Sequence, residues 1–207
     1  MLEQSLVKPG HFGSSIENIK IINNFIELKD LKKIQSFLPN INEWMDAGEN
    51  QYSEDGTCTY DASYWSNRQC SWDILKKINI EIYNLVDFYI DKMRLFLEES
   101  FKVELTKRPP VIIRWFPGLE QQPHADKQLN DGSPNPFPTY DLNSLFYYND
   151  EFTGGELYYP DYDLIIKPSP GLAVAHPGDI NYLHGVKKVL SGERFTTPSF
   201  YTISKLL

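Results

Sequence analysis

The hydrophobic pattern changes along the chain, from helical spacing in the first half to short strand-like runs in the second. Residues 19–40 open with an alternating apolar run and then place Leu31, Ile34 and Leu38 on one helical face. This pattern predicts an edge strand that leads into a helix. Residues 40–70 are polar and aromatic without a clear period, which predicts a long loop or an irregular hairpin.

Residues 72–101 carry the clearest helical period of the chain. Ser71 precedes them as a candidate N-cap. Apolar side chains then recur on one stripe, at Leu75, Ile78, Ile82, Leu85, Tyr89, Met93 and Phe96. We therefore predict one amphipathic helix whose apolar stripe packs against the core.

From residue 110 onward, short β-rich runs are separated by Gly, Pro, Asn and Asp. There are seven of them: VIIRWF, SLFYYN, GELYYP, LIIK, GLAVAHP, INYLHGV and RFTTPSFYTI. Such closely spaced runs are typical of an antiparallel sandwich or barrel. The predicted class is α+β, a single domain over 1–207 in which 1–109 gives strand and helix support and 110–207 forms the β-barrel. Pro198, inside the last run, predicts a sheet edge or a bulge.

Composition narrows the range of partners. The chain has 207 residues, 41% of them hydrophobic, which is enough for one substantial core. Its formal charge of -8 disfavours nucleic acid and anionic membranes, because both attract clustered Lys and Arg. We expect a soluble, cytoplasmic protein without a signal peptide or a membrane span. Cys58 and Cys70 are expected to be reduced thiols, with a bridge between them as the alternative.

The stretch QPHAD places His124 and Asp126 on either side of one small residue. On an extended chain their side chains share a face, so the pair could close on one metal ion, although a surface hydrogen bond is the common alternative. A third ligand would come from His11, His176 or His184. His11 lies in a Gly- and Ser-rich terminal segment where disorder is expected. Two His and one carboxylate form the facial triad of oxygen-activating iron sites.

The second half of the chain also carries several motifs in a fixed order. They are R-W-F-P-G…P-H-A-D, L-F-Y-Y-N-D…G-G-E-L, G-L-A-V-A-H-P-G-D and L-H-G-V-x-x-V-x-x-G-x-R-F. In this order they resemble the prolyl 4-hydroxylase family of Fe(II)- and 2-oxoglutarate-dependent oxygenases. The resemblance implies a double-stranded β-helix, which is a jelly-roll barrel, with N-terminal helices packed on one sheet. One departure is Trp115, which stands where the family usually has a tyrosine.

The resemblance also implies roles for individual residues. His124, Asp126 and His184 correspond to the iron ligands, and His176 to a position that the family does not use for metal. Arg194 corresponds to the basic residue that binds the distal carboxylate of 2-oxoglutarate, a task that suits a planar guanidinium. Hydroxyl groups of Tyr147 and Thr196 would contact the same carboxylate. Packing within the sheet is the alternative for both.

The spacing from His184 to Arg194 adds a geometric condition. If the two residues lie on opposed strands of one hairpin, both face inward only when the connecting loop has an odd number of residues. A three-residue loop that uses Ser191 and Gly192 fits, with Gly192 in the left-handed conformation.

The implied activity is hydroxylation of prolyl residues in a peptide or protein, with release of succinate and CO2. Its cofactors would be Fe(II), 2-oxoglutarate as cosubstrate, O2 and, as a further candidate, ascorbate. Residues 45–71, including Tyr60, Tyr64 and Trp65, stand where the family has a mobile loop, so we expect a lid, with a plain surface loop as the alternative. Two other functions stay open: hydroxylation of a free amino acid or other small molecule, and a non-catalytic cupin-like barrel that binds a metal or ligand.

Overall fold

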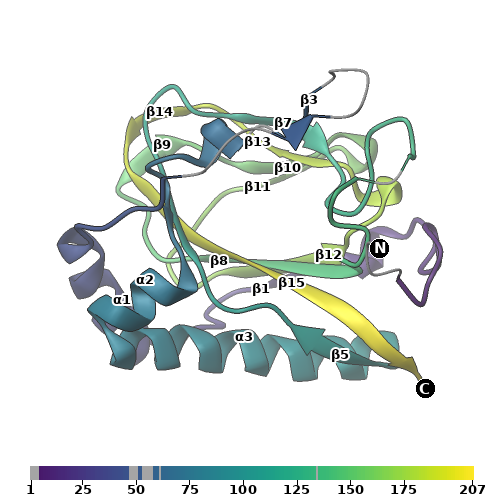
Figure 1. The fold of residues 1–207 in the computed structure, drawn as a ribbon, viewed down its shortest axis with the longest axis horizontal. Coiled ribbons are helices and arrows are strands. Elements are labelled where there is room, and N and C mark those ends of the chain that lie inside the picture. The colour runs from purple at the N-terminus through teal and green to yellow at the C-terminus, as the bar shows by residue number, and fades with distance from the viewer. Residues whose placement is uncertain (1–4, 47–50, 53–57, 61, 134) are drawn as a thin grey trace.

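The molecule is built in layers, with helices, a large sheet and a small sheet stacked in that order (Figure 1). The computed structural model describes residues 5–46, 51–52, 58–60, 62–133 and 135–207. The strand pairs in both sheets are antiparallel. The predicted α+β class with helices on one sheet is therefore confirmed.

The large sheet has seven strands in the order β1-β12-β8-β15-β6-β4, with β5 also paired to β15. These strands are β1 (Lys20–Ile22), β4 (Gln69–Cys70), β5 (Val103–Lys107), β6 (Ile112–Trp115), β8 (Leu142–Tyr147), β12 (Ala173–Pro177) and β15 (Arg194–Leu206). The alternating run near residue 20 does form an edge strand, since β1 pairs with β12 alone. Strands that precede residue 110 thus complete the sheet.

The small sheet has four strands in the order β11-β10-β13-β7. These are β7 (Gln121–His124), β10 (Leu157–Tyr159), β11 (Leu164–Ile166) and β13 (His184–Val186). Two further strand pairs join β9 (Phe152–Gly154) to β14 (Val189–Gly192) and β2 (Gln51–Tyr52) to β3 (Cys58–Tyr60). Each of the seven predicted β-rich runs contains a strand, whereas β4, β5, β7, β9 and β14 were missed.

Pro198 lies in β15, which is a central strand and not an edge of the sheet. On one side, β8 pairs with β15 through this region, with Leu145 opposite Pro198. On the other side, pairing with β6 ends at Thr196 and pairing with β5 begins at Tyr201. A residue without an N–H is tolerated in that gap. On the side where its partner changes from β6 to β5, β15 therefore has an unpaired edge only around Pro198.

Helices cover the face of the large sheet that points away from the small sheet (Figure 1). They are α1 (Leu28–Phe37), α2 (Trp72–Ile78) and α3 (Ile80–Phe101), and five short 3-10 helices occur in the described part, η1 (Ile16–Asn18), η2 (Leu38–Asn40), η3 (Ala62–Trp65), η4 (Pro160–Tyr162) and η5 (Ile180–Tyr182). The prediction of one helix over 72–101 was wrong. Asn79 leaves the helical conformation and caps α3 by accepting a hydrogen bond from the N–H of Ile82.

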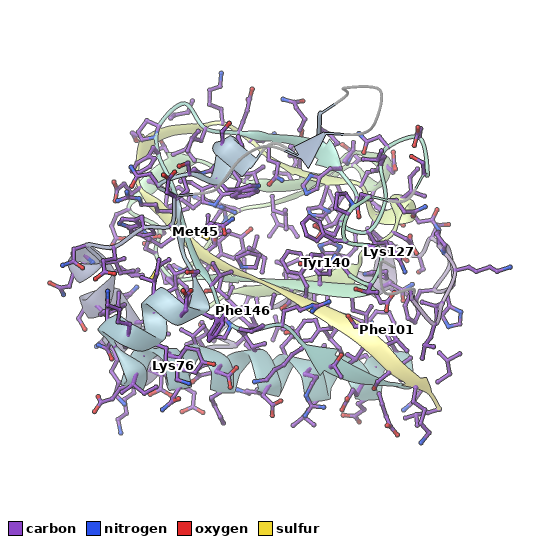
Figure 2. The ribbon with its side chains drawn as sticks, viewed as in Figure 1. Met45, Lys76, Phe101, Lys127, Tyr140 and Phe146 are labelled. Carbon is purple, nitrogen blue, oxygen red and sulfur yellow. The ribbon has the colours of Figure 1, made fainter. Side chains whose placement is uncertain are left out.

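Alternation along β8 separates the two sides of the large sheet. Phe146 points into the core beneath the helices, where its ring lies 5.7 Å from that of Phe25. The next residue, Tyr147, belongs to the cluster between the sheets. Figure 2 shows Phe146 near the helical layer and Tyr140 on the opposite side of the sheet. Residues of β8 on the same face as Tyr147 therefore point into the space between the two sheets, where a site could form.

The N-terminal segment around His11 is ordered, contrary to the expectation of disorder there. Val7 is buried, and the N–H of Gly10 donates to Asp179 at 2.9 Å. The amide of Asn18 donates to the hydroxyl of Tyr182 at 2.8 Å. These contacts attach the segment to the turn between β12 and β13. His11 itself is exposed and takes no part in a metal-type cluster.

A buried ion pair fixes the chain immediately after Asp126. Lys127 and Asp141 lie 2.5 Å apart with almost fully buried side chains. Asp141 also accepts hydrogen bonds from the hydroxyl of Ser5 and from the N–H of Ile203. The pair thus joins the N-terminal segment, the loop after β7 and β15.

Replacing Lys127 with methionine is expected to lower the free energy of unfolding by about 3 kcal/mol, because it leaves a buried carboxylate without its cation. Urea unfolding measures this change. Lys205→Met is the matched control, since it breaks an exposed pair with Glu104 of 2.8 Å and is expected to cost less than about 0.5 kcal/mol. Equal losses in the two variants would show that burial of the first pair has no effect.

Cys70 is a buried free thiol in β4, and desolvation raises its pKa to about 12. The side chain of Cys58 lies outside the described residues. Among the described helices, none combines the length and apolar character that crossing a membrane requires.

Candidate metal centre

Two neighbouring strands of the small sheet bring the first ligand candidates together. His124 ends β7 and lies directly opposite His184, the first residue of β13, with ring centroids 4.6 Å apart. Asp126 follows two residues later, and its N–H donates to the carbonyl of Gly178 at 3.0 Å. Asp126 lies just beyond the end of β7, and this backbone bond holds it where its carboxylate faces the two imidazoles.

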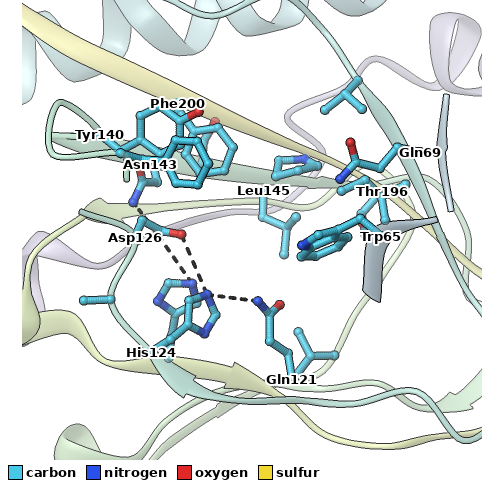
Figure 3. Close-up of a pocket in the computed structure, with 18 of the residues that line it drawn as sticks. Trp65, Gln69, Gln121, His124, Asp126, Tyr140, Asn143, Leu145, Thr196 and Phe200 are labelled. Atoms are coloured by element: carbon cyan, nitrogen blue, oxygen red, sulfur yellow. Dashed lines mark hydrogen bonds and ion pairs between the residues drawn. The ribbon is translucent and has the colours of Figure 1, made fainter. Parts of the chain in front are cut away.

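His124, Asp126 and His184 form a group whose candidate ligand atoms all lie within 4.8 Å of one another. Nε2 of His124 is 3.7 Å from one carboxylate oxygen of Asp126, and Nε2 of His184 is 3.6 Å from the other (Figure 3). Nδ1 of His124 is 2.9 Å from the carbonyl of Gln122, and Nδ1 of His184 is 3.1 Å from that of Tyr182. With the proton on Nδ1, each Nε2 offers its lone pair to the centre.

Burial sets the electrostatics of this group. Desolvation raises the pKa of Asp126 from its ordinary value, against the opposing effects of His124, His176 and Asn143. Desolvation also lowers the pKa of His184 well below its ordinary value, with His176 and His124 acting in the same direction. A cation at the centre would stabilise the buried carboxylate and would match two neutral imidazoles.

Two amide side chains that sequence reasoning missed contact the group. Asn143 on β8 donates to Asp126 at 2.5 Å, and the amide nitrogen of Gln121 lies 3.2 Å from Nε2 of His124 (Figure 3). A signal for Asn143 was present, because it and Ser144 are the two polar residues in the otherwise apolar strand β8. Gln121 gave no such signal, since it lies in a strand that was not predicted.

His176 is buried on β12 beside the group but outside it. Its ring lies 4.3 Å from that of His184 and edge-on to Tyr159 at 5.4 Å. Its Nδ1 is 2.9 Å from the carbonyl oxygen of Pro177. Of the four histidines, His124 and His184 thus lie in the cluster, and His11 and His176 lie outside it.

The large sheet contributes a buried cation to the same space. Arg194, at the start of β15, is fully buried, and its Nη2 lies 3.4 Å from the hydroxyl of Tyr147. Its Nε and Nη1 have no hydrogen-bond partner among the residues that the structure describes. Thr196, paired in register with Tyr147, has a buried hydroxyl that likewise finds no partner there. The three predicted cosubstrate residues therefore lie together.

The hairpin expected between His184 and Arg194 does not form. His184 belongs to the small sheet, whereas Arg194 belongs to the large one, and β14 between them pairs with β9. The rule of an odd loop length therefore does not apply, and both residues reach the same space because the sheets face each other. The left-handed conformation expected for Gly192 is present, with φ of 74°.

Two more buried polar groups have no hydrogen-bond partner among the described residues. They are the indole N–H of Trp115, which is paired in register with Arg194, and the hydroxyl of Tyr159 on β10, whose ring lies beside His176 and His184. Buried donors without acceptors are rare in folded proteins. Trp115, Arg194 and Thr196 all line the same cavity, so its end at Arg194 is rich in donors, which suits an anionic, oxygen-rich ligand.

A cavity of about 1110 Å³ joins these features. It is lined by the metal-type group, Arg194 and Trp115, and also by a stack of three rings, Phe137, Tyr140 and Phe200. The centroids in this stack are 5.0 and 4.2 Å apart. Of the expected lid residues, Tyr64 and Trp65 line the cavity, and the side chain of Tyr60 lies outside the described residues.

Comparison with known proteins rests on structure. No family model matches the chain, and no curated protein matches it by sequence. A viral collagen prolyl hydroxylase from Paramecium Bursaria Chlorella virus-1, in its 2OG complex, is 16% identical with a TM-score of 0.61 over 93% of this chain and 99% of its own. A prolyl hydroxylase from Trichoplax adhaerens, in complex with a hypoxia inducible factor peptide fragment, is 17% identical with a TM-score of 0.66 over 91% and 84%.

A 2OG-Fe(II) oxygenase family protein from Burkholderia pseudomallei is 15% identical, with a TM-score of 0.54 over 92% of this chain and 87% of its own. The structural neighbours are thus 2-oxoglutarate- and Fe(II)-dependent oxygenases, several of them prolyl hydroxylases. The chain has the fold that these oxygenases share.

Proposed function

We propose that this chain is an Fe(II)- and 2-oxoglutarate-dependent dioxygenase that hydroxylates prolyl residues in a peptide or protein and releases succinate and CO2. One observation carries the proposal. A His-Asp-His group with converging ligand atoms shares a cavity with a buried arginine, Arg194, whose Nε and Nη1 lack acceptors among the described residues. The two sheets that hold these groups would form the double-stranded β-helix of such enzymes, within one domain over 1–207.

The donor set of the metal-type group fits Fe(II). Two imidazole nitrogens and one carboxylate form the 2-His-1-carboxylate arrangement, which leaves coordination positions open on one side. His124, Asp126 and His184 would hold the ion, and Asn143 would orient the carboxylate. Iron bound there would supply oxygen activation and the oxidative decarboxylation of 2-oxoglutarate.

The buried donors fit the far end of 2-oxoglutarate. Arg194 would bind the distal carboxylate through charge-assisted hydrogen bonds, and the hydroxyls of Tyr147 and Thr196 would add two more. The unpartnered N–H groups of Arg194 are the best support for this role, since a carboxylate would satisfy them. The cosubstrate would then run from this pocket end to the metal group and exclude water from both.

Two features support a prolyl substrate. The cavity is large for a five-carbon diacid alone, and its aromatic stack of Phe137, Tyr140 and Phe200 offers flat apolar faces. Proline-rich segments in the extended polyproline conformation bind grooves lined with aromatic rings. Structural neighbours that act on prolyl residues, one of them in complex with a peptide, support the same class.

Residues 45–71 would act as a lid over the peptide, because Tyr64 and Trp65 already line the cavity. The hydroxyl of Tyr64 donates to the carbonyl of Glu120, which joins this segment to the entry of β7. If the segment closes over substrate, deleting residues 53–57 is expected to raise KM for peptides and to leave KM for 2-oxoglutarate near its starting value. Unchanged peptide turnover after this deletion would reject the lid.

The proposed function predicts oxidation of peptide proline. Protein loaded with Fe(II) is incubated with O2, 2-oxoglutarate, ascorbate and a panel of proline-containing peptides, and products are read by tandem mass spectrometry. We expect one added oxygen atom on a proline and stoichiometric succinate. The same peptides with alanine in place of proline are the control and should gain no oxygen.

Other outcomes separate the alternatives. Succinate that forms without any peptide oxidation would favour a free amino acid or another small molecule as the substrate. No succinate from protein that binds Fe(II) would favour a cupin-like binding barrel and reject the proposal.

A further inference from the structure

A second buried arginine lies near the proposed cosubstrate pocket. Arg68 precedes β4 and is only 3% exposed. Its guanidinium carbon lies 4.3 Å from the ring centroid of Tyr64, 4.7 Å from that of Trp65 and 4.4 Å from that of Trp115. Arg68 is thus enclosed by aromatic rings of the 63–70 segment and of β6.

Among the described residues, no carboxylate pairs with the charge of Arg68. Its Nη1 donates to the carbonyl of Tyr64 at 2.9 Å and its Nε to that of Arg114 at 3.4 Å. Its Nη2 is buried and has no hydrogen-bond partner in the part of the chain that the structure describes. No carboxylate of the described residues lies within ion-pair distance of Arg68 or of Arg194. Burying an unpaired cation is costly, so such a group calls for an explanation.

Trp115 connects the two arginines. The guanidinium of Arg194 lies 4.9 Å from the same indole centroid that Arg68 contacts at 4.4 Å. The two cationic carbons are therefore no more than ~9 Å apart, a distance at which charges still interact through a protein interior. An anion that binds Arg194 would be attracted by Arg68 as well, and it would relieve the repulsion between the two cations.

We propose that Arg68 is a second cationic determinant of the pocket end that holds the distal carboxylate of 2-oxoglutarate, acting on that carboxylate through Trp115 without touching it. The proposal rests on the proposed function. Arg68 is a positioning residue in this account, and its effect is specific to ligands that carry a negative charge at the far end. Binding of the cosubstrate is also coupled to packing of the 63–70 segment against β6. Because such coupling is reciprocal, 2-oxoglutarate stabilises the packed segment as much as the packed segment stabilises bound 2-oxoglutarate.

The test is a binding titration without turnover. Protein loaded with Mn(II) is titrated anaerobically with 2-oxoglutarate by calorimetry, and 2-oxobutanoate, which lacks the distal carboxylate, is the comparison ligand. Arg68→Gln is expected to weaken 2-oxoglutarate binding about tenfold and 2-oxobutanoate binding less than about twofold. Metal affinity should stay at the wild-type value. Equal weakening of both ligands would show a merely structural role and overturn the proposal.

Arg114 offers a matched control on the neighbouring strand. It also ties the segment to β6, through 3.0 and 2.8 Å hydrogen bonds to Asn67, and it also stacks on a tryptophan, Trp44, at 3.9 Å. Its guanidinium stacks on Trp44 and Phe116, whereas those of Arg68 and Arg194 stack on Trp115. Arg114→Gln is therefore expected to leave 2-oxoglutarate affinity within about twofold of wild type. If Arg114→Gln weakens binding as much as Arg68→Gln, anchoring of the segment explains the effect and the proposal fails.

Arg68→Lys covers the case in which Arg68→Gln does not fold. Lysine keeps the charge but loses the flat stacking, so we expect affinity for 2-oxoglutarate within about threefold of wild type. A larger loss, shared by 2-oxobutanoate, would again overturn the proposal. Wild-type protein that binds Mn(II) but not 2-oxoglutarate would reject the proposed function itself. Normal wild-type binding that Arg68→Gln leaves unchanged would reject only the role of Arg68.

Hydrogen exchange tests the linkage. In wild-type protein, 2-oxoglutarate should slow amide exchange in the 63–70 segment, where the N–H of Asn67 bonds to Met45 and that of Arg68 to Trp65. The monoacid 2-oxobutanoate should slow it less. Identical exchange with the two ligands would contradict coupling through Arg194 and Arg68.

Discussion

Replacing Asp126 with asparagine is expected to lower affinity for Fe(II) by at least about 100-fold. Mutating a residue that only hydrogen-bonds to a metal ligand already lowers metal affinity by about 10- to 100-fold, and loss of a ligand should cost at least as much. The change removes the only negative charge among the three converging side chains while keeping the size of the residue. Asparagine would also meet the amide of Asn143, which now donates to the carboxylate, so a favourable bond would be lost. Competition with a fluorescent chelator measures the affinity directly.

The matched control is Asp150→Asn, the same chemical change at an exposed position. It should bind metal as the wild type does. Turnover should be undetectable for Asp126→Asn and normal for the control. If Asp126→Asn bound Fe(II) as tightly as wild type, the metal would have to lie elsewhere, and the assignment of the triad would be wrong.

Replacing Arg194 with methionine is expected to weaken 2-oxoglutarate binding by about 100-fold or more, with metal affinity unchanged. Removing the cation from a buried ion pair costs about 3–5 kcal/mol, here in the binding free energy of the distal carboxylate. Every 1.4 kcal/mol is a factor of ten in affinity. Calorimetry with Mn(II)-loaded protein gives the dissociation constant, and KM for 2-oxoglutarate should rise in parallel. Because methionine removes an unpaired buried charge, the ligand-free variant should be at least as stable as wild type in urea.

Arg194→Lys separates charge from geometry. Lysine restores the charge without the planar fork, so part of the affinity should return. The lysine variant should therefore bind 2-oxoglutarate more tightly than the methionine variant and more weakly than wild type. If Arg194→Met weakened 2-oxoglutarate binding and metal binding equally, Arg194 would stabilise the fold and would not bind the cosubstrate.

The candidate site was predictable where its geometry is local. The two-residue period of an extended chain was enough to put His124 and Asp126 on one face, and the structure adds that Asp126 is held by the carbonyl of Gly178. The β-rich runs were also recognisable locally, since their composition and the Gly, Pro, Asn and Asp residues between them are properties of short stretches of sequence. His184 and Arg194 came from the motif resemblance, and the structure brings both to the same space.

Other features depended on which strands pair, and the sequence does not state this locally. The hairpin expected between His184 and Arg194 failed because β13 and β15 belong to different sheets. Asn79 reads as a tolerable residue within a helix, yet its side chain caps α3 and the helix breaks there. The enclosure of Arg68 could not be foreseen either, because it requires β4 to pair with β6 and so bring the segment before β4 to Trp115.

The central claim is that this chain couples oxygen to decarboxylation of 2-oxoglutarate at the triad. The most direct measurement mixes anaerobic, Fe(II)-loaded protein with O2 and 2-oxoglutarate and follows succinate by NMR, beside Asp126→Asn and Arg194→Met. The account predicts succinate from wild type in step with loss of 2-oxoglutarate, none from the first variant and much less from the second at limiting 2-oxoglutarate. Succinate from all three at equal rates, or none from wild type with Fe(II) bound, would contradict it.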